Sequence, residues 1–205
     1  MGDQVVGAGT LFSYLSAFVT IVLALALSDL LISLHRLLRR AHAVKWAALP
    51  VAAALLVLLL LISEFFSIWS MTVVDRVSFG GLVVLLLPNV FVFLAASAVL
   101  PDEVGEEGID LGRFYFENRL YFYLTLACAL AADAPRAAMA GEADLAGLLL
   151  DIALPTVLIA SLFVAMALSE RRWLHWTGLA IAYALISLNF TAQTIAAPAA
   201  IVGQG

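Results

Sequence analysis

Long apolar stretches that lack charged side chains alternate with short polar connections along the whole chain. A helix needs about 20 consecutive apolar residues to cross roughly 30 Å of hydrocarbon, and most of the uncharged stretches supply that length. We therefore predict an all-α bundle of six transmembrane helices, which form a single integral membrane domain over residues 1–205. The predicted spans lie near 11–34, 46–70, 79–100, 114–133, 146–169 and 173–195.

The fourth span depends on residues upstream of its short uncharged run, 120–132. The aromatic residues from Phe114 onward bring it to spanning length, which places Glu117 and Arg119 within its first turns. The preceding segment, 101–113, is rich in acidic residues and glycine and shows neither a helical nor an alternating period. We expect a solvated loop there, because the ligand order of a calcium-binding loop is absent.

Composition agrees with this fold class. Of the 205 residues, 64% are hydrophobic and 12% are charged, whereas soluble domains have about 45–50% apolar and about 25% charged residues. A soluble globular domain and a disordered chain are therefore excluded. The net charge of -5 supplies no basic field for nucleic acid. The lipid bilayer is the partner that the composition indicates.

The distribution of lysine and arginine predicts the orientation, since cytoplasmic loops carry an excess of both residues. With both termini outside, only Arg76 and Arg136 lie at the outer ends of the spans. The inner basic residues are then Arg36, Arg39, Arg40, Lys45, Arg113, Arg119, Arg171 and Arg172. We therefore expect both termini to lie outside. The usage of alanine, leucine and arginine suggests a bacterial cytoplasmic membrane.

Polar residues within the spans are the candidates for function, since an ionisable group near the bilayer centre costs roughly 2.5–3.5 kcal/mol. Asp29 lies near the inner end of its span, and Asn89 lies near the middle of the membrane. The other candidates share an outer depth, and oxygen ligands of this kind suit protons or small hard cations. The candidate ion pathway consists of Asp29, Glu64, Asn89, Asp151, Asn189 and Gln193. Alternatively, the amides only hydrogen-bond between helices, at about 0.6 kcal/mol each.

Two prolines are expected to disturb the backbone close to these candidates. Proline lacks the N–H that pairs with the carbonyl four residues earlier. Pro88 should therefore free the carbonyl of Val84, and Pro155 should free the carbonyl of Asp151. Such carbonyls add oxygen ligands at membrane depth, where irregular backbone must be covered by protein or by water in a cavity.

The inner side of the membrane offers a candidate gate that consists of Arg36, Glu117 and Arg119. Arg113 and Glu117 are spaced to pair along one helix, and Arg119 would face Asp29. The alternative is an interfacial anchor, in which the tyrosines lie at headgroup depth. Asp29 can also pair with Arg36, which lies two turns further along the same helix face. The tyrosines in question are Tyr115, Tyr121 and Tyr123.

The sequence lacks the motifs of common enzymes and cofactor sites. It contains no H-E-x-x-H, no G-x-S-x-G, no Walker A loop and no C-x-x-C. His35, His42 and His175 all fall on the inner side, and a haem between His35 and His175 is geometrically conceivable. Both lie at span ends that suit headgroup contact, so we expect no cofactor, no metal and no enzymatic activity.

Stripes of small residues predict faces where helices pack closely, either within the subunit or between subunits. The stripe of the first span comprises Ser13, Ala17, Thr20, Ala24 and Ser28. A looser series in the sixth span comprises Gly178, Ala182 and Ser187.

The six spans and the Ser28-Asp29 dipeptide loosely resemble the small bacterial relatives of the lysosomal potassium channel. The first helix of that family carries an arginine followed by Phe-Ser-Asp. Here Leu27 stands in place of the phenylalanine, no arginine precedes it in the helix, and the charge distribution puts the N-terminus outside. No functional residue is therefore carried over from that family.

Two functions remain open from the sequence. The first is a small channel or ion-coupled transporter, which would pass a proton or small cation between Asp29 and the outer polar cluster. The second is a non-catalytic membrane subunit, whose polar groups hold its helices to one another and to a partner. That partner would be a membrane protein or further copies of the same chain.

Overall fold

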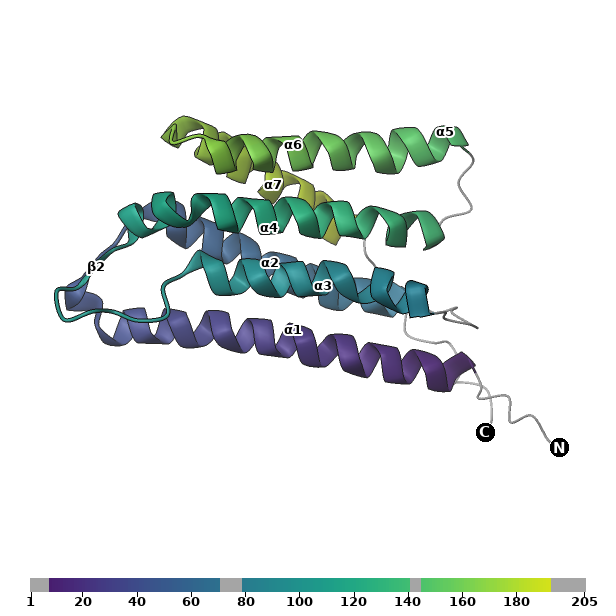
Figure 1. The fold of residues 1–205 in the computed structure, drawn as a ribbon, viewed down its shortest axis with the longest axis horizontal. Coiled ribbons are helices and arrows are strands. Elements are labelled where there is room, and N and C mark those ends of the chain that lie inside the picture. Colours follow the sequence, from purple (N-terminus) through teal and green to yellow (C-terminus); the bar gives the residue numbers. More distant parts are fainter. Residues whose placement is uncertain (1–7, 71–78, 141–144, 193–205) are drawn as a thin grey trace.

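A computed structural model describes residues 8–70, 79–140 and 145–192, and the described chain is almost entirely helical (Figure 1). The long helices are α1 (Ala8–Arg39), α2 (Ala48–Ser70), α3 (Phe79–Val99), α4 (Leu111–Ala140), α6 (Leu154–Leu168) and α7 (Arg172–Ala192). The short elements are η1 (Ala41–Ala43), β1 (Val44–Lys45), β2 (Ile109–Asp110), α5 (Leu145–Gly147) and the π-helix η2 (Leu148–Ala153). The predicted all-α class is confirmed.

Several helices are long and apolar enough to cross a membrane, which is compatible with a membrane protein. Among the described residues these segments number four: Ser13–Arg39, Ala48–Ser67, Gly80–Val99 and Leu148–Leu168. Charged residues accumulate on α4, and only part of α7 has described side chains. The six spans and the outside position of both termini therefore stay predictions.

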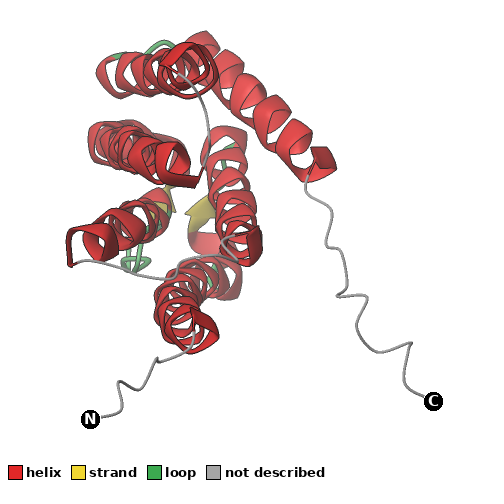
Figure 2. Ribbon diagram, turned by 90° about the vertical axis from the view of Figure 1, so that its right-hand side faces the viewer, coloured by secondary structure: helices red, strands yellow, loops and turns green. Residues whose placement is uncertain are grey.

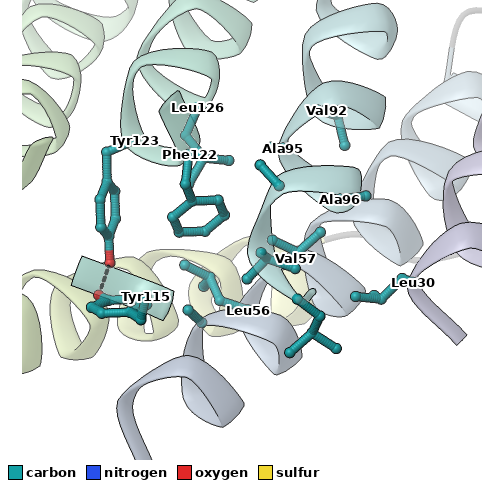
Figure 3. Packing of buried hydrophobic residues seen from close by; sticks show 14 of the residues in the cluster. Leu30, Leu56, Val57, Val92, Ala95, Ala96, Tyr115, Phe122, Tyr123 and Leu126 are labelled. Atoms are coloured by element: carbon teal, nitrogen blue, oxygen red, sulfur yellow. Dashed lines mark hydrogen bonds between the residues drawn. The ribbon is translucent and has the colours of Figure 1, made fainter. Parts of the chain in front are cut away.

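The helices lie roughly along one axis, and α4 occupies the centre of the arrangement. It packs between α3 and α6, while α3 also contacts α1 and α2 (Figure 1). The last helix, α7, packs against α2 and α6, and it slants away from the other helices toward its C-terminal end (Figure 2). Buried apolar side chains from all six long helices form one continuous core. Figure 3 shows part of this core, with labelled residues from α1, α2, α3 and α4.

Helix α1 packs with one face and leaves the other uncovered. Its buried positions recur every three or four residues, as expected for one helix face: Val19, Leu23, Ala26, Leu30, Ser33 and Leu37. The predicted small-residue stripe is exposed at every position: Ser13, Ala17, Thr20, Ala24 and Ser28. The stripe therefore does not pack within the described part of this chain.

The small residues of α7 behave differently. Gly178 and Ala182 are buried, whereas Ser187 is exposed. A Cβ atom on Gly178 would lie 2.2 Å from the Sδ atom of Met166 in α6. The absence of a side chain at Gly178 therefore permits the close approach of these two helices.

One end of the bundle carries all eight of the inner basic residues defined above, and we call it the basic end (Figure 1). Here β1 and β2 form a parallel pair with Val44 opposite Ile109, and the Nζ atom of Lys45 lies 2.7 Å from a carboxylate oxygen of Asp110. The pair joins the connection between α1 and α2 to the connection between α3 and α4. It forms between segments that are distant in the sequence.

The segment 101–113 is thus more ordered than a solvated loop, and that prediction is wrong in part. Its acidic side chains before β2 are exposed, but Val104 is buried. Gly108 has a φ of +82°, and a Cβ atom there would lie 2.3 Å from the carbonyl oxygen of Ala43. Asp110 then caps α4, because its Oδ1 accepts a 3.0 Å hydrogen bond from the N–H of Arg113. The order in segment 101–113 comes from the pairing of β2 with β1, which is distant in the sequence. The hydropathy pattern of the segment itself does not reveal this pairing.

Candidate functional site: a buried tyrosine and histidine chain

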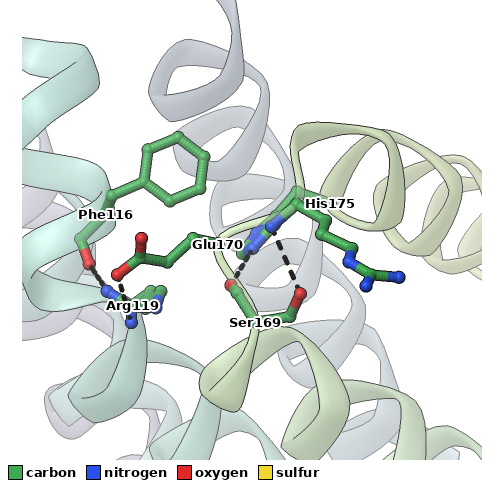
Figure 4. Close-up of polar contacts among 6 residues, drawn as sticks. Phe116, Arg119, Ser169, Glu170 and His175 are labelled. Carbon is green, nitrogen blue, oxygen red and sulfur yellow. Dashed lines mark hydrogen bonds and ion pairs between the residues drawn. The ribbon is translucent and has the colours of Figure 1, made fainter.

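Near the basic end, four residues form a hydrogen-bonded chain that connects α4 to α7. The hydroxyl groups of Tyr123 and Tyr115 lie 2.5 Å apart, although eight residues separate them on α4 (Figure 3). The Tyr115 hydroxyl lies 2.8 Å from Nδ1 of His175, in the first turn of α7. Nε2 of His175 lies 2.9 Å from the carbonyl oxygen of Ser169, in the connection between α6 and α7 (Figure 4).

The direction of each hydrogen bond follows from its acceptors. A carbonyl oxygen can only accept, so the proton of the His175 bond to Ser169 is on Nε2. In the neutral ring Nδ1 is then the acceptor, and Tyr115 donates to it. The oxygen of Tyr115 is left to accept the proton of Tyr123. Neutral His175 therefore gives one consistent direction, from Tyr123 through Tyr115 and His175 to Ser169.

The surroundings of this hydrogen-bonded chain are mainly apolar and aromatic. Tyr115, Tyr123 and His175 are buried, with exposed fractions of 3%, 0% and 0%. The ring centroid of Phe116 lies 5.1 Å from that of His175, and the ring of Phe163 lies 6.1 Å from that of Tyr123. A buried polar group that loses its partner costs about 1–3 kcal/mol. The completed hydrogen bonds are thus what allows three polar side chains to lie in this part of the core.

An ion pair lies beside the hydrogen-bonded residues and also joins α4 to the connection before α7 (Figure 4). Nη2 of Arg119 lies 2.9 Å from Oε1 of Glu170, and its Nη1 donates to the carbonyl oxygen of Phe116. The Arg119 Nε atom is buried and has no hydrogen-bond partner in the described chain.

The sequence suggested that Tyr115, Tyr123 and His175 contact the headgroups, but all three side chains are buried between helices. The buried positions of α4 at this end recur at helical spacing and include Leu111, Tyr115 and Phe122. That spacing is the signal in the sequence that indicates a buried face. Tyr121 points away from this face and is exposed, as expected for an interfacial tyrosine.

The structure distributes the described ion-pathway candidates over different environments. Asp29 and Glu64 are half-buried, Asn89 is buried, and Asp151 is exposed on η2. The side chains of the remaining two candidates, Asn189 and Gln193, lie outside the described residues. Three pockets in the described part of the chain, with volumes of about 640, 550 and 390 Å³, have no pathway candidate in their linings.

The two prolines have different effects on the backbone. Helix α3 continues through Pro88, and Nδ2 of the adjacent Asn89 donates to the carbonyl oxygen of Leu85, 3.0 Å away. Before Pro155 the chain forms the π-helix η2, in which the N–H of Leu154 donates to the carbonyl of Leu149, five residues earlier. The irregularity expected near Pro155 thus takes the form of a π-helix.

The three candidate gate residues contact different partners. Nη1 of Arg36 donates to the carbonyl oxygen of Asp102, 2.7 Å away, and Arg119 pairs with Glu170. Glu117 accepts a 2.7 Å hydrogen bond from Nε of Arg113, so the pair predicted from their spacing is confirmed. Asp29 forms no ion pair within the described residues.

The histidines offer little to a metal or haem. Both ring nitrogens of His175 are occupied by Tyr115 and Ser169, while His35 is exposed on α1. Among the described residues, no group of three or more His, Cys, Asp or Glu side chains is arranged to hold a metal ion. The chain of buried hydroxyls and imidazole is therefore best described as a contact between helices.

Comparison of the chain with protein-family models, with curated proteins and with solved structures gives no significant match.

Proposed function

We propose that this chain is a non-catalytic membrane subunit, a helical scaffold that associates with a partner in a bacterial cytoplasmic membrane. The observation that carries the proposal is the buried chain from Tyr123 to Ser169, which ends on a backbone carbonyl of the protein itself. A similar contact joins α7 to α2, where the hydroxyl of Tyr183 donates to the carbonyl oxygen of Ala52, 2.6 Å away. These polar groups serve contacts between helices and leave no donor directed at a substrate.

The exposed small-residue stripe of α1 is the surface we assign to the partner. Small side chains let helix backbones approach closely, and in lipid such packing is a main source of helix association. Ala17 and Ala24 lie two turns apart on this stripe, and both are exposed. The partner is a transmembrane helix, supplied by another membrane protein or by a second copy of this chain.

The test is purification from the native membrane in a mild detergent, followed by mass determination of the intact complex. We expect a stoichiometric complex that the substitution Ala24→Leu weakens, because the larger side chain separates the helix backbones. Ala165→Leu is the matched control, since Ala165 is exposed on α6, away from the stripe. A parent protein that purifies as a monomer without a partner contradicts the proposal, as does equal loss of the complex in both variants.

A channel or ion-coupled transporter for protons or small cations is the second candidate function. It is favoured by Asn89, whose Oδ1 is buried near the middle of α3 and has no hydrogen-bond partner in the described chain. A spare oxygen at that depth can ligate a cation or accept a bond from water. Flux into proteoliposomes tests this function. Substitution of Asn89 by Leu, Glu64 by Gln or Asp151 by Asn should reduce it, and a parent protein without flux contradicts it.

A further inference from the structure

A pocket at the basic end carries side chains of both charges. It has a volume of about 640 Å³ and lies between the last turn of α1 and the segment that follows α3. Its lining consists of Arg36, Arg39, Arg40, Asp102, Glu103 and Val104. Within the described residues, none of these five charged side chains forms an ion pair.

Two of the arginines are held in place by backbone contacts. Nη1 of Arg36 donates to the carbonyl oxygen of Asp102, and Nη1 of Arg40 donates to that of Val104, each over 2.7 Å. A guanidinium has five N–H donors, so each arginine retains donors for a ligand. The contacts reduce the conformational entropy that these side chains lose when a ligand binds.

Arg39 and Glu103 are the free charges of the pocket. Both are exposed, and neither has a hydrogen bond or ion pair in the described chain. The carboxylate of Asp102 accepts one hydrogen bond from Ser33, over 3.3 Å. The pocket therefore presents guanidinium donors for an anion and carboxylate acceptors for a cation, both in one space.

The position of the pocket indicates where its ligand lies. Arg39 is the last residue of the first apolar segment, Ser13–Arg39, so the pocket lies where that helix reaches the headgroup layer. Ile32, one turn before Arg36 on the same side of α1, is 48% exposed and provides apolar surface for an acyl chain below the pocket. Guanidinium groups at this depth suit phosphate oxygens.

We propose that this pocket binds a phosphodiester that carries a primary ammonium group, as in a phosphoethanolamine headgroup. The phosphate contacts the arginines, above all Arg39, and the ammonium donates to the carboxylates of Glu103 and Asp102. A purely anionic headgroup leaves the two carboxylates unpaired beside its own charge. The proposal is independent of the proposed function, since the pocket is separate from the small-residue stripe.

The test is native mass spectrometry of the purified full-length chain in detergent. Phosphatidylethanolamine, phosphatidylcholine and phosphatidylglycerol with identical acyl chains are added one at a time. The parent protein should retain phosphatidylethanolamine best, because choline has no N–H and glycerol has no positive charge. Arg39→Gln should weaken binding of phosphatidylethanolamine and phosphatidylcholine by about tenfold, the effect of one charge-assisted hydrogen bond. Arg172→Gln, which removes an exposed arginine of the basic end outside the pocket, should leave binding unchanged.

The substitution Glu103→Gln distinguishes the contact of the carboxylates with the ammonium from the contact of the arginines with the phosphate. It should lower the affinity for phosphatidylethanolamine and leave that for phosphatidylcholine unchanged. Titration with soluble phosphoethanolamine identifies the source of the headgroup: binding that depends on Arg39 in the absence of lipid indicates a soluble ligand, and binding only of the lipid indicates a membrane component. Equal binding of the three lipids by the parent protein overturns the proposal, as does a preference for phosphatidylglycerol or an equal effect of Arg39→Gln and Arg172→Gln.

Discussion

The hydroxyl of Tyr115 lies 2.8 Å from Nδ1 of His175 and joins the first turns of α4 to the first turn of α7. Both side chains are buried, so the bond forms where neither partner can exchange it for water. Helix α7 slants away from the bundle beyond this point (Figure 2). The contact between these two residues therefore contributes directly to the attachment of α7.

The first prediction tests the direction of the hydrogen-bonded chain. Tyr115→Phe removes the donor to His175 and the acceptor of Tyr123, and should lower the free energy of unfolding by about 1–3 kcal/mol. Tyr123→Phe should cost less, because Tyr115 still donates to His175. Denaturant titration in mixed micelles, followed by circular dichroism, measures both values. Tyr121→Phe, at an exposed position of α4, is the control. A loss for Tyr123→Phe equal to or above that for Tyr115→Phe contradicts the assigned direction.

The second prediction concerns Gly108. Its φ of +82° and the 2.3 Å approach of the Ala43 carbonyl to a Cβ atom both disfavour any side chain. Gly108→Ala should destabilise the pairing of β1 with β2 by more than about 1 kcal/mol. Gly105→Ala is the matched control, because a Cβ atom there has nothing within 4 Å. Hydrogen exchange of the strand amides reports the change, and equal protection in the two variants would argue against the strain.

The third prediction concerns the contact of α6 with α7. Gly178→Ala places a methyl group against Met166 and should destabilise the protein by about 1–3 kcal/mol, as overpacking does. Met166→Ala opens space for that methyl group, so the double variant should be more stable than the sum of the single effects predicts. A double-mutant cycle of unfolding free energies measures this coupling. Additive effects would show that the two residues do not meet.

The fourth prediction is a pH dependence at the basic end. The hydrogen bond from Lys45, with the backbone N–H of Arg113, holds the pKa of Asp110 below its usual value of 3.8. A lowered folded-state pKa means that the ionised carboxylate stabilises the folded protein above about pH 3.8, and that this contribution is lost as the pH falls through the folded pKa.

Asp110→Asn tests this effect, because asparagine also caps a helix but carries no charge. The variant should unfold more readily than the parent at pH 7, and the difference should shrink in a series of unfolding experiments carried below pH 3.8. A difference that is constant across the series would show that the Asp110 charge does not contribute.

The helices could largely be predicted from the sequence, because charged residues delimit each apolar run. The second predicted span, 46–70, corresponds to α2 (Ala48–Ser70), and the third, 79–100, corresponds to α3 (Phe79–Val99). The fourth helix begins at Leu111, before the predicted 114, because Asp110 caps it. Hydropathy does not register such a cap, which depends on the position of one carboxylate.

The contacts between helices could not be predicted from the sequence in the same way. A tyrosine near the end of a span fits the headgroup region and the core equally well by composition, so the burial of Tyr115 and Tyr123 depends on which face of α4 meets α7. The pairing of Val44 with Ile109 likewise depends on how α2 and α3 bring two distant connections together. The helical spacing of Leu111, Tyr115 and Phe122 indicates that this face of α4 is buried, but it does not show which helix covers the face.

The parallel strand pair has a mechanical consequence. Strand β1 precedes α2 and strand β2 follows α3, so their pairing connects the C-terminal end of α1 to the N-terminal end of α4. A displacement of the C-terminal end of α1 would therefore also displace the start of α4, one turn before Tyr115. The strand pair thus couples the first helix to the first turns of α4, where Tyr115 contacts His175 of α7.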